Sequence, residues 1–277
     1  MIKEYDLKFY DAITVADSVL YERYVDRIAQ VLTDCGLFDN VVKNKPSGEG
    51  TYADYSVEAY VGDAKIVKFS LDAAVITPSS ASATTKFLNA HVLSFYYGDG
   101  SYACEPIKPT SRTAYTAGIG FRYAYITSNG VMFKFNEYSA SSGTVTSWGS
   151  IIIAKSNKQH PLVIAPNFSG TNAIRGTTVA CHSYEIIVGC YSDEKYSKSK
   201  TQYQGLDCQL YNFNTTAKQT EMFPFLGYGS PNNDNTYSKY ALWIPFAPTS
   251  VRNGNFQKVL VNDKAYVTDG YFALRDD

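Results

Sequence analysis

The chain has 277 residues, enough for one large all-β domain or two ordinary ones that fold without covalent cross-links. Its 25 Lys and Arg nearly balance its 26 Asp and Glu, so a formal charge of −1 provides no basic field to attract nucleic acid or anionic lipid. No stretch approaches the ~20 consecutive apolar residues of a membrane-spanning helix, and we predict none.

Residues 14–36 carry the one pattern typical of an amphipathic helix. Thr14 or Asp17 is placed to cap its start, and Gly36 stands where a left-handed residue ends a helix. Charges of both signs on the opposite face predict a solvated, near-neutral surface. The apolar stripe, which we expect to pack on a sheet, recurs at spacings of three and four: Val15, Val19, Leu20, Tyr24, Ile28, Val31, Leu32 and Cys35.

After the helix the pattern changes to the period of two that is typical of β-strands. Two strands are predicted on either side of Gly62–Asp63. Asn129–Gly130 predicts a hairpin with a type I′ turn, because both central residues of that turn need positive φ. The apolar triplets at 151–153 and 162–164 predict strands that are covered on both faces.

The chain is divided by composition into three parts. Residues 1–191 are predicted to hold the helix and the main β-sandwich, and the polar stretch 192–205 is predicted to be an exposed loop or seam. Residues 206–277 are predicted to form an irregular wrap and a C-terminal β-meander of the same domain. The fold class is therefore mainly β: an antiparallel sandwich or barrel-like body with one N-terminal amphipathic helix and a terminal meander.

No combination of residues predicts a catalytic, cofactor or metal site. Cys181 and His182 are adjacent, but neighbours on a strand point to opposite faces and do not easily share an ion. No GxSxG, HExxH or glycine-rich phosphate loop occurs. Glu58 and Glu185 each interrupt apolar strand residues and are the candidates for a pair of glycosidase carboxylates, although alternation also puts such residues on a solvated sheet face. We predict that the chain is not an enzyme and uses neither a cofactor nor a metal.

Tyrosine is the compositional outlier, at 24 residues against 15 Phe and 2 Trp. Strand preference alone would place most single tyrosines at sheet margins. The excess as a whole is equally typical of a surface made for other subunits or for sugars. Five cysteines without a CxxC spacing, and an N-terminus without a signal-type apolar run, favour synthesis in a reducing cytoplasm.

The last stretch, VLVNDKAYVTDGYFALRDD (259–277), alternates apolar and polar residues and turns at Asn262–Asp263 and Asp269–Gly270. It resembles the C-terminal ends of structural proteins of tailed bacteriophages and prophages of gut and Gram-positive bacteria. In those proteins a hydrophobic strand, a turn and a short pair of strands recur. The residues that carry the likeness are Lys264, Tyr266, Gly270, Tyr271, Ala273 and Leu274.

The resemblance implies a structural component of a virion, in the tail, the baseplate or the head–tail connection, made in the host cytoplasm. Its expected partners are further copies of the chain in a symmetric homo-oligomer and other virion structural proteins. The meander would offer an edge strand to a neighbour or cover an edge of its own body. The candidate interface residues are Tyr266, Tyr271, Phe272, Leu274, Tyr237 and Tyr240.

Two further hypotheses remain from the residues. The first is a receptor- or glycan-binding module of a tail tip, for which the loop Ser230–Tyr240 supplies aromatic, Asn and Asp side chains toward a host-surface glycan. The second is a glycosidase that acts on the cell envelope, which no motif supports.

Overall fold

The computed structural model contains one α-helix and nineteen short strands among its described residues. The backbone is described for residues 1–48, 51, 54–71, 75–76, 84–88, 92–95, 117–139, 145–155, 161–166, 184–188, 201–202, 221–224, 242–246, 257–268 and 272–277. Side chains are described for 1–48, 51, 54–71, 84–88, 121–134, 150–155, 161, 258–268 and 272–277.

The strands form four antiparallel sheets. A seven-stranded sheet has the order β1 (Lys3–Asp6), β9 (Ala117–Thr127), β10 (Gly130–Ser139), β11 (Val145–Ala154), β12 (Leu162–Pro166), β13 (Tyr184–Val188) and β14 (Thr201–Gln202). A four-stranded sheet has the order β3 (Asn40–Asn44), β4 (Ser56–Val61), β5 (Ala64–Ser70) and β8 (Val92–Phe95). A three-stranded sheet has the order β2 (Tyr10–Ala12), β7 (Thr85–Leu88) and β6 (Val75–Ile76). A five-stranded C-terminal sheet has the order β15 (Glu221–Pro224), β16 (Leu242–Phe246), β19 (Ala273–Asp276), β18 (Lys264–Thr268) and β17 (Gln257–Val261).

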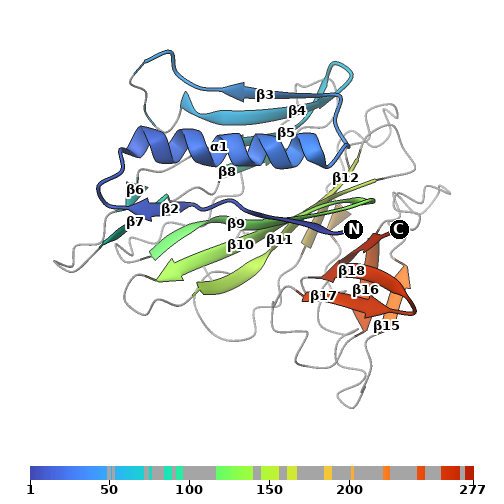
Figure 1. Cartoon of the computed structure of the whole chain (residues 1–277). Coiled ribbons are helices and arrows are strands. Elements are labelled where there is room, and N and C mark those ends of the chain that lie inside the picture. The colour runs from blue at the N-terminus through green and yellow to red at the C-terminus, as the bar shows by residue number, and fades with distance from the viewer. Residues whose placement is uncertain are drawn as a thin grey trace.

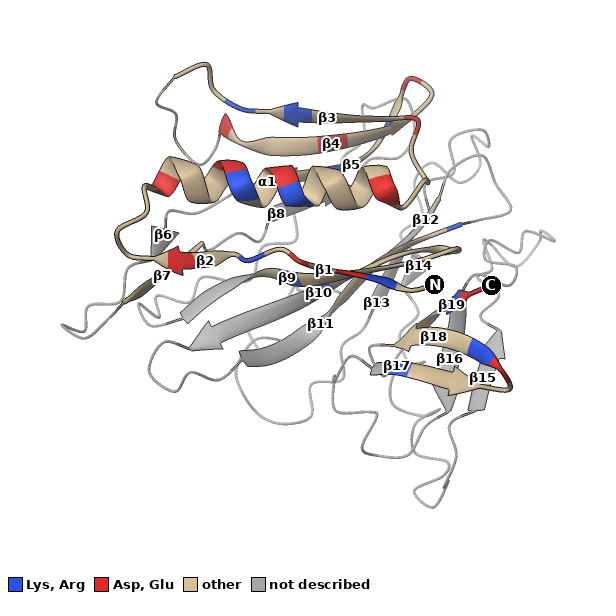
Figure 2. Ribbon diagram, viewed as in Figure 1, with Lys and Arg blue, Asp and Glu red and all other residues tan. Residues whose placement is uncertain are grey.

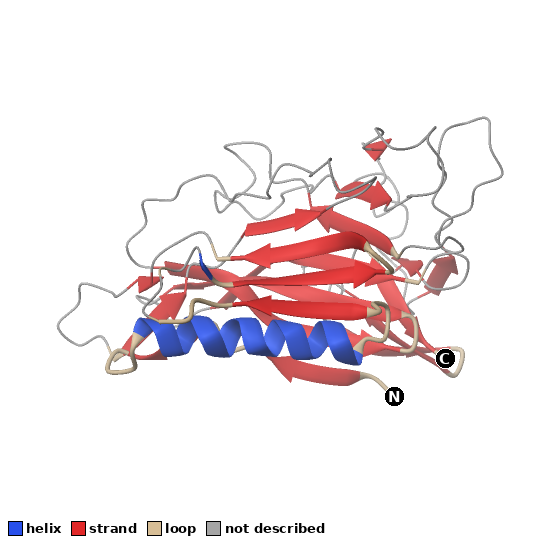
Figure 3. Cartoon of the chain, turned by 90° about the horizontal axis from the view of Figure 1, so that it is seen from above, coloured by secondary structure: helices blue, strands red, loops and turns tan. Residues whose placement is uncertain are grey.

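The predicted mainly β fold with one N-terminal helix is confirmed, and none of the described sheets closes into a barrel. The helix α1 (Asp17–Asp34) lies between the four-stranded and the seven-stranded sheets (Figure 1). Seen from above, α1 runs alongside the strands (Figure 3). The terminal meander β17–β18–β19 is also present, but β16 and β15 extend it into a larger sheet.

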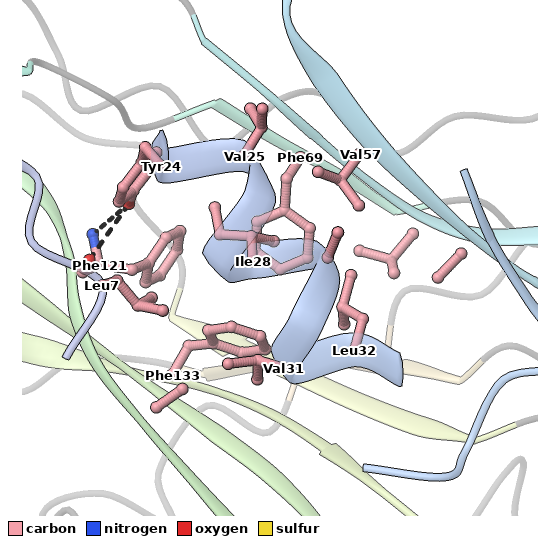
Figure 4. Packing of buried hydrophobic residues seen from close by; sticks show 14 of the residues in the cluster. Leu7, Tyr24, Val25, Ile28, Val31, Leu32, Val57, Phe69, Phe121 and Phe133 are labelled. Atoms are coloured by element: carbon pink, nitrogen blue, oxygen red, sulfur yellow. Dashed lines mark hydrogen bonds between the residues drawn. The ribbon is translucent and has the colours of Figure 1, made fainter. Parts of the chain in front are cut away.

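The core joins the helix to the inner faces of both larger sheets. The ring of Phe69 on β5 lies 5.8 Å from that of Phe121 on β9 and 5.1 Å from that of Phe133 on β10, measured between centroids. Ile28 and Leu32 of α1 pack into the same cluster (Figure 4). Aromatic pairs at such separations add to the stabilisation that burial of their area provides.

The boundaries of α1 differ at one end from those that its sequence predicts. Its end is confirmed, because Gly36 follows Cys35 with φ +66°. Its start is not: the N-cap is Ala16, which makes no side-chain capping bond. Neither Thr14 nor Asp17 caps the helix, because it begins later than expected and takes Asp17 as its first residue.

The buried surface of α1 is wider than the predicted stripe. Tyr21, Val25 and Ala29 are buried in addition to most of the predicted residues, whereas Val19 is 51% exposed. A helix that packs on one sheet buries one stripe, but this helix lies between two sheets and buries a broader arc. The placement of Val19 in the core was therefore wrong.

The two hairpins predicted around Gly62–Asp63 and near Asn129–Gly130 are both present. β4 and β5 pair around Gly62–Asp63, and β9 pairs with β10. The type I′ turn at Asn129–Gly130 is not found: the turn residues are Ser128 and Asn129, and Asn129 does not have positive φ. Gly130 is required for another reason, since a Cβ there would lie 2.8 Å from Ala154 Cα and closer still to the carbonyl oxygen of Ile153.

The remaining sequence predictions fall partly on described residues. β11 pairs with β12, and the triplet Ile151–Ile153 is fully buried, as strands covered on both faces require. The side chains of 162–164 lie outside the described residues. Within the predicted loop 192–205, Thr201–Gln202 forms β14, and the rest is likewise not described.

Candidate assembly surface at the C-terminal sheet

Three of the six predicted interface residues are described, and all three are buried within the chain. Tyr266 and Leu274 lie on β18 and β19, and Phe272 immediately precedes β19. Tyr237, Tyr240 and Tyr271 lie outside the described residues. A subunit contact at these six residues stays a prediction. Because Tyr266, Phe272 and Leu274 are buried, a second subunit could touch very little of their side chains.

The first turn of the meander, at Asn262–Asp263, fixes the register of β17 against β18. Asn262 and Asp263 both have positive φ, at 50° and 60°, which is the backbone of a type I′ hairpin. At the end of β18, the Thr268 hydroxyl donates a hydrogen bond of 2.7 Å to the Phe272 carbonyl, next to the start of β19. The predicted turn residues Asp269–Gly270 themselves are not described.

The end of β19 is bound to the turn between β9 and β10. The Asn129 side-chain amide donates to the Arg275 carbonyl at 3.0 Å and to the Asp277 carboxylate at 2.7 Å. Asp276 accepts from the Ser128 backbone amide at 2.9 Å, and the Asp277 amide donates to the Ser128 hydroxyl at 2.7 Å. These contacts of Arg275, Asp276 and Asp277 with Ser128 and Asn129 are called the C-terminal latch below.

The electrostatics of the latch favour the charged form of the Asp277 carboxylate. A hydrogen bond from Arg275 is the main cause of a lowered pKa at Asp277; burial opposes the shift, and the Asn129 amide reinforces it. The N-terminal ammonium of Met1 lies 2.6 Å from the Asp276 carboxylate. The latch is therefore ionic as well as hydrogen-bonded at neutral pH.

A second tie joins β17 to the body. The Lys258 ammonium lies 2.8 Å from the Glu4 carboxylate of β1 and 5.7 Å from the centroid of the Tyr125 ring of β9. Among described residues, the main core cluster has no member from 257–277. The buried residues of the C-terminal sheet therefore lie outside the main core cluster, and Lys258 and the latch supply polar contacts between this sheet and the body.

The strand β17 lies at the edge of the five-stranded sheet (Figure 1). Its Leu260 is 71% exposed, and Val259 and Val261 on either side are half-buried. Edge strands are commonly protected from pairing by charges, prolines or bulges. Here the one charge is that of Lys258, which already binds Glu4. The residues Lys258–Val261, called the β17 edge below, form our candidate assembly surface.

The sequence contained a signal for this surface that the choice of interface residues passed over. Val259, Leu260 and Val261 form an apolar triplet directly before a turn. Successive side chains on a strand point to opposite faces, so a triplet must place apolar side chains on both. On a strand at the edge of a sheet, one of them is left in solvent.

The carboxylate of Glu58 forms a buried ion-pair cluster with two lysines. It is 8% exposed, so its expected place on a solvated face was wrong. The Tyr60 hydroxyl donates to it at 2.6 Å, and the Lys65 and Lys68 ammonium groups lie 2.9 and 3.1 Å away. Burial alone would raise its pKa, but these three donors outweigh burial and lower the pKa to about 2. Such a carboxylate is ionised at neutral pH and has no proton to donate; the Glu185 side chain is not described.

A second candidate surface lies on the stretch FRYAY (121–125). The Arg122 guanidinium lies 4.8 Å from the ring centroid of Tyr123 and 5.6 Å from that of Tyr10. The Lys134 ammonium lies 6.0 Å from the Tyr123 ring, and burial together with Arg122 lowers its pKa. Tyr10, Arg122, Tyr123 and Lys134 are all half-buried and are called the ring–cation cluster below.

A metal site, a reactive thiol and a membrane-spanning helix each have requirements that the described residues do not meet. No group of three His, Cys, Asp or Glu that could hold a metal occurs within them. Cys35 is a buried free thiol whose pKa burial raises to about 11. The one described helix is not apolar enough to cross a bilayer. Outside the described residues lie His91, His160, His182, Cys104, Cys181, Cys190 and Cys208.

Comparisons with family models, with curated proteins and with solved structures found no match to this chain. Its function is therefore argued from its own residues and contacts.

Proposed function

We propose that this chain is a structural subunit of a tailed-bacteriophage virion, in the tail, the baseplate or the head–tail connection. It acts through symmetric contacts between its own copies and through contacts with other virion proteins, and it carries out no catalytic step. The observation that carries this proposal is the β17 edge: β17 is the outermost described strand of its antiparallel sheet, and its Leu260 is 71% exposed. The phage setting rests on the resemblance of residues 259–277.

The β17 edge has the chemistry of a subunit contact. Pairing would satisfy its outward backbone groups and would remove Leu260 from water, which contributes about 1.5–3 kcal/mol for a side chain of this size. A specific interface buries roughly 1,200–2,000 Å² in total, so this one strand supplies the centre of a contact and not the whole of it.

The test is to look for the chain in the particle. Phage particles from cells that express the chain are purified by density gradient, and their proteins are quantified by mass spectrometry against a major capsid protein. The proposal predicts a fixed copy number per particle that does not fall on repeated purification. Recovery only in the soluble lysate would contradict it.

The ring–cation cluster favours a second candidate, a receptor- or glycan-binding module. Half-buried Tyr10 and Tyr123 beside Arg122 offer ring faces and a charge that would suit a sugar with a carboxylate or sulfate group. The earlier candidate loop Ser230–Tyr240 lies outside the described residues. Binding on a glycan array that Arg122→Gln abolishes would support this function; equal binding by both proteins, or none, would remove it.

A further inference from the structure

The backbone of β17 determines which residues face its outer edge. β17 pairs with β18 from Gln257↔Thr268 to Val261↔Lys264, and the two-residue turn closes on that last pair. The pair that flanks such a turn is hydrogen-bonded, and antiparallel pairs alternate between bonded and non-bonded along the ladder. Val259 and Val261 therefore bond to β18, while Lys258 and Leu260 direct their backbone amides and carbonyls outward.

A second copy of the same strand can meet this edge in few symmetric registers. A two-fold axis perpendicular to the sheet exchanges the two strands and leaves each face of the sheet on the same side. Each even-numbered residue therefore lies opposite an even-numbered residue of the second copy, and each odd-numbered residue opposite an odd-numbered one. An axis at Lys258 places two ammonium groups opposite each other, which is destabilising. An axis at Val259 places Leu260 opposite Lys258.

An axis at Leu260 gives the most favourable set of neighbours. The two Leu260 side chains then lie opposite each other and cover their exposed surface. Val259 lies opposite Val261 of the second copy, and Lys258 lies opposite Asn262 and stays free to bind its own Glu4. The residues that become paired are apolar, and no like charges meet.

We propose that two copies of this chain join their C-terminal sheets by antiparallel pairing of β17 with β17, on a two-fold axis at Leu260. This inference rests on the proposed function and names the partner and register of the same surface. The joined sheet is continuous across the two copies, so one strand pair links two bodies with a defined orientation. Other contacts of the chain would then build the larger assembly.

The register is tested by disulfide trapping in the full-length protein. With Leu260→Cys, the two Cα atoms of a hydrogen-bonded pair lie ~5.5 Å apart, within the ~4.4–6.8 Å that a disulfide spans. With Val259→Cys, the two cysteines are diagonal neighbours at ~7–8 Å and should not cross-link. The wild-type chain, oxidised in the same way, controls for its own five cysteines. The readout is the dimer fraction on a non-reducing gel, with the linked peptide identified by mass spectrometry.

Each outcome decides between the register and the proposed function. A dimer trapped by Leu260→Cys and not by Val259→Cys supports the inference. An oligomer that neither cysteine traps, or that only Val259→Cys traps, overturns this register and leaves the proposed function standing. A monomer at all concentrations, with the chain absent from particles, overturns both.

A charge substitution gives an independent check. Leu260→Lys places two ammonium groups on the axis and should raise the dimer dissociation constant at least tenfold, while an exposed position leaves the folded monomer intact. An unchanged unfolding midpoint with a lost dimer supports the inference. A dimer of unchanged affinity contradicts it.

Discussion

At the scale of single residues, Tyr24 shows how a side chain completes a sheet. The pairing of β1 with β9 ends at Asp6↔Tyr123, close to a register irregularity in β9. Beyond that point the Phe121 amide donates to the Tyr24 hydroxyl at 2.8 Å, and the hydroxyl donates to the Phe121 carbonyl at 3.3 Å (Figure 4). A phenol from α1 therefore satisfies backbone groups that β1 does not reach, and its burial raises the pKa of Tyr24.

Replacing Tyr24 with Phe should lower the free energy of unfolding by about 1–3 kcal/mol, because two buried backbone groups lose their partner while the ring remains. Urea denaturation at neutral pH measures the loss. Tyr55→Phe is the matched control: Tyr55 is also buried, and its hydroxyl makes no hydrogen bond among the described residues. Equal losses in the two variants would show that the Phe121 contact does not stabilise the fold.

The ion cluster at Glu58 gives stability a predictable dependence on pH. Because the pKa of Glu58 is lowered from its ordinary 4.5 to about 2, its contribution is fully present above pH 4.5 and is lost as the pH falls toward 2. Glu58→Gln should therefore cost roughly 1–3 kcal/mol at pH 7, since two lysines lose their shared carboxylate, and less at acid pH.

The measurement is the free energy of unfolding of both proteins between pH 7 and pH 2.5. Glu22→Gln is the control: Glu22 pairs with Lys45 at an exposed site, so this substitution should change stability much less than Glu58→Gln does. A difference between Glu58→Gln and the wild type that stays constant with pH would contradict the assigned ionisation.

At the scale of elements, the polar face of α1 is held by strands on both sides, where a freely solvated face was expected. Lys45 pairs with Glu22, and Lys43 with Asp26, from the side of β3. Toward β1 and β2, Arg23 pairs with Asp11. Figure 2 shows these alternating charges along the helix. The two lysine pairs are exposed, and such pairs stabilise little individually, whereas the pair of Arg23 with Asp11 is half-buried.

The elements themselves were largely predictable, because their signals are local. Spacing at three and four predicted α1, and Gly62–Asp63 predicted the β4–β5 hairpin. The pairing of β1 with β9 was not predictable, since it joins residues more than a hundred positions apart. No turn or periodic pattern encodes such a contact; it follows from which apolar faces the core brings together.

The same limit applies to the candidate surface. Tyrosine content indicated interface material, yet every tyrosine whose side chain is described is buried or half-buried: Tyr5, Tyr10, Tyr21, Tyr24, Tyr55, Tyr60, Tyr123, Tyr125 and Tyr266. Residue type does not distinguish a ring that packs inside the chain from one that awaits a partner. The exposed Leu260 became visible only once the order of strands placed β17 at an edge.

At the scale of the whole molecule, the latch joins the end of the C-terminal sheet to the turn between β9 and β10. Asn129→Ala removes two hydrogen bonds of the latch and should speed amide exchange across Ala273–Asp276, with a loss of about 1 kcal/mol in local stability. Hydrogen–deuterium exchange with mass spectrometry measures this.

The matched control for the latch is Asn44→Ala, which removes a hydrogen bond of 3.1 Å to Ser56 far from the C-terminal sheet. It should leave exchange at β19 unchanged. If Asn129→Ala also leaves it unchanged, the latch does not hold the sheet. If copies of the chain associate through the β17 edge as proposed, loss of the latch should also weaken that association.

The central claim is that copies of this chain associate through the β17 edge. Sedimentation velocity of the purified wild-type chain and of Leu260→Lys, at matched concentrations and neutral pH, tests it most directly. We predict a wild-type species of at least twice the 30.7 kDa chain mass, and a folded monomer for the variant. A wild-type chain that sediments as a monomer at every concentration, or a variant that assembles as the wild type does, would contradict the claim.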